Sequence, residues 1–139
     1  MTLVVDASVF VAALLDTGIA GQWAESLIAS ETIVAPELAM VETTNILRRL
    51  ERAKEISSLE ANLVQRDFMH LDIQLFPYSP FAERIWALRN NITSYDAWYV
   101  ALAEALDCRL ATLDQKLVHS NGAHCSFLSL PTSKEPGKQ

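Results

Sequence analysis

The sequence predicts an α/β fold in which a mostly parallel sheet of about five strands is covered by helices on both faces. The first observation is an alternation along the chain between short apolar runs and longer segments in which apolar residues recur at helical spacing. The second is the run at residues 3–5, which contains only apolar residues and is therefore typical of a strand buried on both faces.

Five short runs are expected to form the strands of this sheet. They cover residues 3–5, 32–35, 73–76, 109–112 and a part of 125–130. The second and third runs are each followed by a proline, Pro36 and Pro77, which ends a strand because proline has no backbone N–H to donate. The first and fourth runs lead instead into an aspartate, Asp6 and Asp114.

Segments with helical periodicity fill the connections. They cover residues 9–15, a stretch around 23–28 after a loop at 16–21, and residues 37–54, 57–69, 80–88, 95–106 and 115–118. The buried stripe of the helix at 37–54 is assigned to Leu38, Val41, Ile46, Leu47 and Leu50. That of the helix at 95–106 is assigned to Tyr95, Trp98, Tyr99, Leu102 and Leu106. Ser57 and Glu60 form a capping box, and Thr93 or Ser94 caps the helix at 95–106.

Length and composition indicate one globular domain, residues 1–130, followed by a polar tail at residues 131–139. Hydrophobic residues make up 50% of the chain and charged residues 20%, as in an ordinary globular protein. No apolar run is long enough to cross a bilayer, and no basic region typical of a secretory signal opens the chain, so we expect a cytoplasmic protein without a membrane partner. Cys108 and Cys125 are expected to be free thiols.

The net charge of −6 argues against a general nucleic-acid-binding protein, because such proteins are normally basic. This argument weakens if several of the acids form a metal-binding cluster. Divalent cations bound to such a cluster would neutralise much of the negative charge of the chain.

Asp6 lies where the first strand ends and the first helix begins. In open parallel α/β sheets, ligands bind at this carboxyl edge. Strong hydrophobes flank Asp6 on both sides, so its carboxylate is expected to be paired, hydrogen-bonded or bound to a cation. The alternative is that Asp6 only caps the following helix, and the two interpretations stay open at this point.

Three further acids occupy comparable places. Glu42 follows the turn after the second strand and shares a helix face with Asn45, although a solvated glutamate is the alternative. Asp96 lies in the first turn of a helix, where backbone amides stabilise an anion, and it could merely complement the helix dipole. Asp114 closes the fourth strand beside the hydroxyl of Thr112, and it could instead cap the short segment that follows.

These four acids can converge, because the carboxyl ends of parallel strands meet at one edge of the sheet. Clustered carboxylates repel one another and raise each other's pKa values. A divalent cation makes such a cluster tolerable, and a ligand set of oxygens alone suits Mg²⁺ or Mn²⁺ better than zinc.

Four segments resemble the PIN-domain nucleases, and in particular the VapC-type toxins of bacterial toxin–antitoxin pairs. They are VVDASV at residues 4–9, PEL at 36–38 with Glu42 and Asn45, YDAWYVALA at 95–103, and TLD at 112–114. The resemblance spans residues 3–130 and implies a three-layer α/β/α fold.

The resemblance also implies an endoribonuclease that depends on Mg²⁺ or Mn²⁺ and is inhibited by a cognate VapB-type antitoxin. A homodimer and a structured RNA substrate, such as tRNA or ribosomal RNA, are further implications. Asp6, Glu42, Asp96 and Asp114 match the acidic positions of the family. On this basis Asp6, Asp96 and Asp114 are assigned to the metal, and Glu42 to the metal or to the attacking water.

Thr112, Asn45 and Ser8 are assigned as supporting residues of the same site. Many relatives carry a further acid shortly after the last aspartate, where this chain has the sequence QKL at residues 115–117. A second metal site is therefore expected to be weaker or to be completed by the substrate.

Three arginines are candidates for contacts with the RNA backbone: Arg48, Arg49 and Arg89. For Arg48 and Arg49 the favoured alternative is a solvated charge that complements the C-terminal dipole of the helix at 37–54.

Two other interpretations fail on spacing. A haloacid-dehalogenase-type phosphatase needs a second aspartate two residues after the first, where this chain has Ser8. The positions of Cys108, His119, His124 and Cys125 fit no common structural zinc site. A catalytically inactive PIN-fold module that binds RNA or an antitoxin stays open, and so does a nuclease that acts on DNA.

Overall fold

The computed structural model describes residues 1–130, and its strands form one five-stranded sheet. The strands are β1 (Thr2–Val5), β2 (Thr32–Pro36), β3 (Ile73–Phe76), β4 (Arg109–Ala111) and β5 (Phe127–Leu128). They lie in the order β3-β2-β1-β4-β5, and every neighbouring pair is parallel. The predicted α/β class with a parallel sheet is confirmed. The predicted polar tail, residues 131–139, lies outside the described residues.

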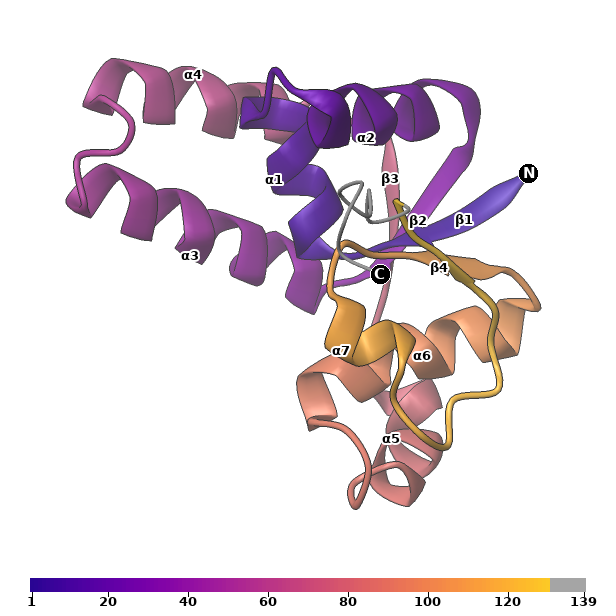
Figure 1. Cartoon of the computed structure of the whole chain (residues 1–139). Coiled ribbons are helices and arrows are strands. Elements are labelled where there is room, and N and C mark those ends of the chain that lie inside the picture. Colours follow the sequence, from indigo (N-terminus) through magenta and orange to yellow (C-terminus); the bar gives the residue numbers. More distant parts are fainter. Residues whose placement is uncertain (131–139) are drawn as a thin grey trace, which may run out of the picture.

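Helices cover both faces of this sheet. They are α1 (Ala7–Leu15), α2 (Ile19–Ser30), α3 (Leu38–Arg52), α4 (Ser58–Met69), the 3₁₀-helix η1 (Ser79–Phe81), α5 (Ala82–Ala87), α6 (Ser94–Leu106) and α7 (Gln115–Val118). Figure 1 shows α1 to α4 on one side of the strands and α5 to α7 on the other, which makes the three layers that were expected. None of these helices is by itself long and apolar enough to cross a membrane; only α1 and α2 taken together, at an angle of 108°, reach that length and composition.

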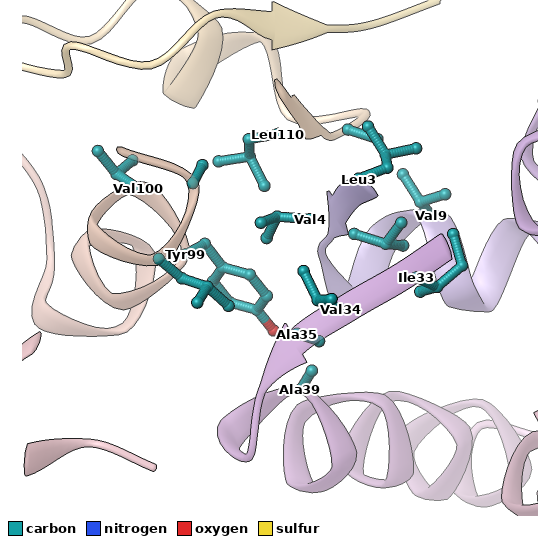
Figure 2. Close-up of a cluster of buried hydrophobic side chains, with 14 of the residues drawn as sticks. Leu3, Val4, Val9, Ile33, Val34, Ala35, Ala39, Tyr99, Val100 and Leu110 are labelled. Carbon is teal, nitrogen blue, oxygen red and sulfur yellow. The ribbon is translucent and has the colours of Figure 1, made fainter. Parts of the chain in front are cut away.

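The central strand β1 has neighbours on both edges and packing on both faces, as its wholly apolar sequence predicts. Leu3 pairs with Ile33 of β2 on one edge and with Arg109 of β4 on the other. Val4 lies toward Tyr99 of α6 (Figure 2). Leu3 points to the opposite face, because side chains alternate along a strand, and both are almost fully buried. Each such side chain contributes about 1.5–3 kcal/mol to the stability of the fold.

The loop predicted at residues 16–21 is wrong in its second half. Helix α2 begins at Ile19, so Gly21 lies inside the helix. A β-carbon at Gly21 would lie 1.7 Å from the carbonyl oxygen of Asp16, so only glycine lets α2 approach the preceding turn this closely. The sequence pattern predicted a loop at Gly21, whereas Gly21 lies in α2 and is required for the packing of this helix.

Two buried stripes were also partly misplaced. In α3 the packed face carries Ala39, Thr43 and Leu47, and Val41 is 67% exposed. Val41 lies two residues after Ala39, which is a rotation of about 200° around the helix and therefore the opposite face. In α6, Tyr95 is 62% and Leu106 is 38% exposed, because they lie in the first and last turns, at the ends of the packed segment.

The predicted helix caps are present. Ser57 accepts a hydrogen bond from the amide of Glu60 at 3.0 Å, and Thr93, rather than Ser94, caps α6. Cys108 and Cys125 are free thiols, as expected, and both are partly buried.

Replacing Gly21 with alanine is expected to destabilise the fold, because the new methyl group would overlap the backbone of Asp16. Overpacking of this kind costs about 1–3 kcal/mol, measurable as a lower midpoint of urea unfolding. Gly18→Ala is the matched control. Its β-carbon would meet only the Asp16 side chain, at 3.1 Å, and this side chain can move. Equal stability of the two variants would contradict the assignment.

Candidate active site at the carboxyl edge of the sheet

Asp6 lies at the end of β1 and is only 8% exposed. Its Oδ1 accepts hydrogen bonds from the hydroxyl of Ser8 at 2.5 Å and from the amide of Val9 at 3.2 Å. Its Oδ2 accepts a hydrogen bond from the hydroxyl of Thr112 at 2.5 Å. Asp6 therefore caps α1 and also lies in a network from two strand ends, so the two interpretations that were open do not exclude each other.

The two hydroxyls connect Asp6 to the turn that follows β4. The Ser8 hydroxyl oxygen accepts from the amide of Leu113 at 3.1 Å, and the Thr112 hydroxyl oxygen accepts from the amide of Asp114 at 3.0 Å. Each hydroxyl thus donates to the carboxylate of Asp6 and accepts from the backbone beside Asp114. The ends of β1 and β4 are fixed together, and Ser8 and Thr112 both contact Asp6, while their supporting role in a catalytic site stays a prediction.

Glu42 is held from the opposite side of the sheet. The hydroxyl of Tyr99, on α6, donates a hydrogen bond of 2.6 Å to Oε1 of Glu42, on α3. Figure 2 shows this hydroxyl directed toward the end of β2 and the start of α3, near Ala35 and Ala39. Sequence reasoning assigned Tyr99 to the core and missed this contact. The available signal was a tyrosine, rather than a phenylalanine, at a fully buried helix position.

Asp96 and Asp114 lie at two helix starts. Asp96 is partly buried in the first turn of α6, behind its cap Thr93. Asp114 is exposed and accepts from the amide of Lys116 at 2.9 Å, so it caps α7 as the alternative interpretation had it. Both acids line the same cavity, of about 680 Å³, together with Arg89.

The four carboxylates interact, and Asp96 is common to all these interactions. Burial raises the pKa of Asp6 to about 6 against three hydrogen bonds that lower it, and the charge of Asp96 raises it further. Burial also raises the pKa of Glu42. The hydrogen bond from Tyr99 lowers this pKa, and the charge of Asp96 raises it further. The pKa of Asp96 is raised by burial first and by Asp114 second.

No basic side chain compensates this cluster within the described residues. The ion pairs found there join the N-terminal amino group to Glu31 and Arg84 to Glu104, so neither involves the four acids. An uncompensated donor set of carboxylate oxygens fits a hard divalent cation such as Mg²⁺ or Mn²⁺. Within residues 1–130, no three acidic, histidine or cysteine side chains are arranged as a ready-made metal site. The assignment of Asp6, Asp96 and Asp114 as ligands therefore stays a prediction.

Some residues predicted for the site lie outside this network. Asn45 is exposed on α3, and no hydrogen bond within the described part of the chain joins it to Glu42. Arg48 and Arg49 are exposed on the same helix and do not line the cavity that contains Asp96 and Asp114. Of the three arginines, the structure brings only Arg89 to that cavity.

The family comparison covers most of the chain. The model of the PIN domain family matches residues 3–121. The chain belongs to the PIN domain family. The resemblance inferred from the four segments is thereby confirmed. Of the four acids that it singled out, Asp6 and Asp114 directly follow β1 and the turn after β4, and Glu42 and Asp96 lie near the starts of α3 and α6.

Relatives of known description narrow the family further. The chain is 39% identical over 129 residues to ribonuclease VapC9 of Mycobacterium tuberculosis (strain ATCC 25618 / H37Rv), covering 93% of this chain and 98% of the relative. It is 38% identical over 125 residues to ribonuclease VapC1 of the same strain, covering 89% and 94% of the two chains. The PIN domain described here is therefore one of the VapC-type ribonucleases.

Solved structures agree on the fold. PAE2754 from Pyrobaculum aerophilum matches with a TM-score of 0.69 and 21% identity, covering 91% of this chain and 83% of that one. VapC20 of Mycobacterium tuberculosis, a toxin that cleaves the sarcin–ricin loop, matches with a TM-score of 0.63 and 15% identity, covering 83% and 92%. VapBC2 from Rickettsia felis, bound to a promoter DNA fragment, matches with a TM-score of 0.64 and 14% identity, covering 94% of this chain and 100% of that one.

The metal-free protein is expected to lose stability as the pH rises through the pKa of Asp6. This pKa is about 6 in the folded chain, whereas the ordinary value is 3.8. Between these two pH values the folded state therefore keeps a proton that the unfolded state has released. The unfolding free energy therefore falls between about pH 4 and pH 6, by about 3 kcal/mol for this residue alone. Urea unfolding in EDTA over this pH range measures the slope.

The variant Asp6→Asn should reduce that slope and raise the melting temperature of the metal-free protein at neutral pH. Asp72→Asn, at an exposed position away from the site, is the control and should keep the slope of the wild type. An unchanged slope in Asp6→Asn would show that another group is responsible.

Proposed function

We propose that this chain is the toxin of a type II toxin–antitoxin pair and cleaves RNA as an endoribonuclease that depends on Mg²⁺ or Mn²⁺. The observation that carries the proposal is the uncompensated set of four interacting carboxylates at the carboxyl edge of a VapC-type PIN domain. A cytoplasmic location, a homodimer and inhibition by a cognate VapB-type antitoxin belong to the same proposal.

Asp6, Asp96 and Asp114 would hold the cation. When bound, a divalent cation lowers the pKa of a water molecule and polarises a phosphoryl oxygen. Ser8 and Thr112 fix both oxygens of Asp6, so this carboxylate is oriented before any ligand arrives. An oriented ligand of this kind loses little conformational freedom on binding.

Glu42 is suited to receive or orient a proton of the attacking water. Tyr99 holds its Oε1, which leaves Oε2 for a water molecule. Its raised pKa, caused first by burial, makes its carboxylate a better proton acceptor than a solvated glutamate. Attack by water on the phosphodiester leaves a 5′-phosphate, whereas attack by the ribose 2′-hydroxyl does not.

The partners and the substrate are supported by the printed descriptions of similar proteins. The Rickettsia felis neighbour is a VapBC2 assembly, which supports an antitoxin as the partner. The VapC20 neighbour cleaves the sarcin–ricin loop, which supports a structured RNA, such as tRNA or ribosomal RNA, as the substrate. An inactive binding module is not favoured, because all four acids are present and interact.

Asp96→Asn should abolish cleavage of RNA while the chain stays folded, because Asp96 is the acid that interacts with the other three. Mapping of RNA 5′ ends with Mn²⁺ or with EDTA measures the activity. A second readout is thermal: Mn²⁺ should raise the melting temperature of the wild type and do so much less for the variant.

Asp72→Asn should behave as the wild type in both assays. Undiminished cleavage by Asp96→Asn would overturn the proposed function. Faster cleavage of single-stranded DNA than of structured RNA would identify the protein as a DNA-directed nuclease.

Tyr99→Phe should lower kcat by about tenfold, because one hydrogen bond to a charged group is worth about 1.5 kcal/mol or more. The Tyr99 hydrogen bond lowers the pKa of Glu42, so its loss should also move the acidic limb of the pH–rate profile to higher pH. Tyr78→Phe, at a partly exposed tyrosine that packs on Trp98, is the control. A lower melting temperature with an unchanged pH profile would leave Tyr99 a purely structural role.

A further inference from the structure

The cavity that Asp96 and Asp114 line lies between two segments far apart in the sequence. One wall is the connection from α5 to α6, at residues 89–93. The other wall is α7 and the loop after it, at residues 116–121. In Figure 1 these segments lie on the same side of the sheet, next to the start of α6. We name this feature the α5–α7 groove.

Most side chains that line the α5–α7 groove are polar, and Ile92 and Leu117 are its apolar members. Beyond the two acids it carries cations, amides and hydroxyls. These are Arg89, Asn90, Asn91, Thr93, Lys116, His119, Ser120 and Asn121. Sites for small molecules are mostly apolar and enclosed, whereas the phosphates and sugars of a nucleic acid are contacted mainly by Arg, Lys, Ser, Thr and Asn side chains. The composition therefore fits a strand of nucleic acid better than a small ligand.

Two cations stand in the groove without an acidic partner. Within the described residues, Arg89 and Lys116 take part in neither of the ion pairs. Arg89 is held in place by Trp86, since its guanidinium lies 4.3 Å from the centre of the indole ring and donates to the Trp86 carbonyl at 2.9 Å. The backbone amide of Lys116 bonds to Asp114, which places this residue next to one of the acids.

The groove lining therefore brings two carboxylates and two cations together. A polyanion whose reacting phosphate lies at the carboxylates needs positive charge on the phosphates that follow. Arg89 and Lys116 supply this positive charge in the groove, although the chain as a whole has a net charge of −6.

The ion pair of Arg84 and Glu104 fixes the loop that follows α7, which we call the far wall of the groove. Arg84 donates to both oxygens of Glu104, at 2.7 and 3.0 Å, and Arg84 Nη2 also donates to the carbonyl of Gly122 at 2.7 Å. Glu104 accepts in addition from the amide of His124 at 2.6 Å. Burial works to raise the pKa of Glu104, but these hydrogen bonds outweigh it and hold the pKa below its usual value.

The loop is also fitted to the opposite wall at one position. Gly122 has φ +89°, and a β-carbon there would lie 2.5 Å from Nδ2 of Asn91. The loop thus packs directly against the α5–α6 connection, and the pair of Arg84 and Glu104 bonds to its backbone at Gly122 and His124.

We infer that the α5–α7 groove binds the RNA strand beyond the scissile phosphate, with Arg89 and Lys116 as its phosphate-contacting residues and with Arg84 and Glu104 as positioning residues for its far wall. This inference rests on the proposed function of the four carboxylates. Arg84 and Glu104 touch neither the acids nor, by this assignment, the RNA, so they act only through the loop.

Binding can be measured apart from cleavage. In an Asp96→Asn background, fluorescently labelled total tRNA is the probe, and its affinity is followed by anisotropy over a range of salt concentrations. Arg89→Ala and Lys116→Ala should each weaken binding about five- to tenfold and reduce the slope of log K against log salt by about one. Lys116→Ala keeps the amide that bonds to Asp114, so the cap of α7 is preserved.

Arg109→Ala is the matched control, because Arg109 is an exposed arginine that lines a different cavity, at the amino edge of the sheet. Its binding and salt slope should equal those of the parent. A double variant Arg89→Ala/Lys116→Ala that binds tRNA as tightly as the parent, with the same salt slope, would overturn the inference.

The positioning role has its own test in the active chain. Glu104→Gln and Arg84→Met should raise KM several-fold with kcat within about twofold, and Arg84→Lys should restore part of the loss. If these variants only lower the melting temperature and leave KM unchanged, the pair is merely structural. If the wild type cleaves no RNA at all, the proposed function fails, and the tRNA binding comparison still decides whether the groove binds RNA.

Discussion

The structure depends on one buried charge, the carboxylate of Asp6. It lies at the end of the central strand, where the packing of both sheet faces would otherwise favour an apolar group. Three hydrogen bonds, from Ser8, Val9 and Thr112, lower the cost of burying it but do not remove that cost, since its pKa is still raised to about 6. The same bonds hold β1, α1 and the turn after β4 in register. A group that destabilises the metal-free chain thus also organises the edge where the chemistry is proposed.

The other three acids extend this conflict between stability and function. A fold selected for stability alone would separate these charges or pair them with basic residues. Here Asp96 interacts with each of the others, and the arginine–glutamate pair of the described chain lies elsewhere, between α5 and α6. Functional sites are the places where local rules of stability are broken. The polar groove beside Asp96 and Asp114 gives the basic residues a different task, because it places them where a polyanion would lie rather than on the acids.

Much of the site could be predicted because its residues mark the ends of elements. A wholly apolar run followed by an aspartate indicates both a buried strand and its carboxyl edge, and parallel pairing then brings Asp6 and the end of β4 together. Helix faces were harder to assign. Val41 and Tyr95 are apolar and correctly spaced, yet both are exposed, because the start of α3 is packed through Ala39 and Thr43, and Tyr95 lies at the end of α6. Periodicity identifies a stripe but not which of two stripes meets the sheet.

By itself the sequence determined the α/β class, the order of the elements and the acids at strand and helix ends, because hydrophobic period and chain punctuation are local properties. Only the tertiary structure decided the roles of contacts between distant residues. The Tyr99 hydroxyl on Glu42, the Thr112 hydroxyl on Asp6, the Leu113 amide on the Ser8 hydroxyl and the Arg84–Glu104 pair join residues 20 to 106 positions apart. Tight packing around Gly21 is of the same kind. Such contacts depend on how elements lie against one another in space, and no pattern within a single segment records that.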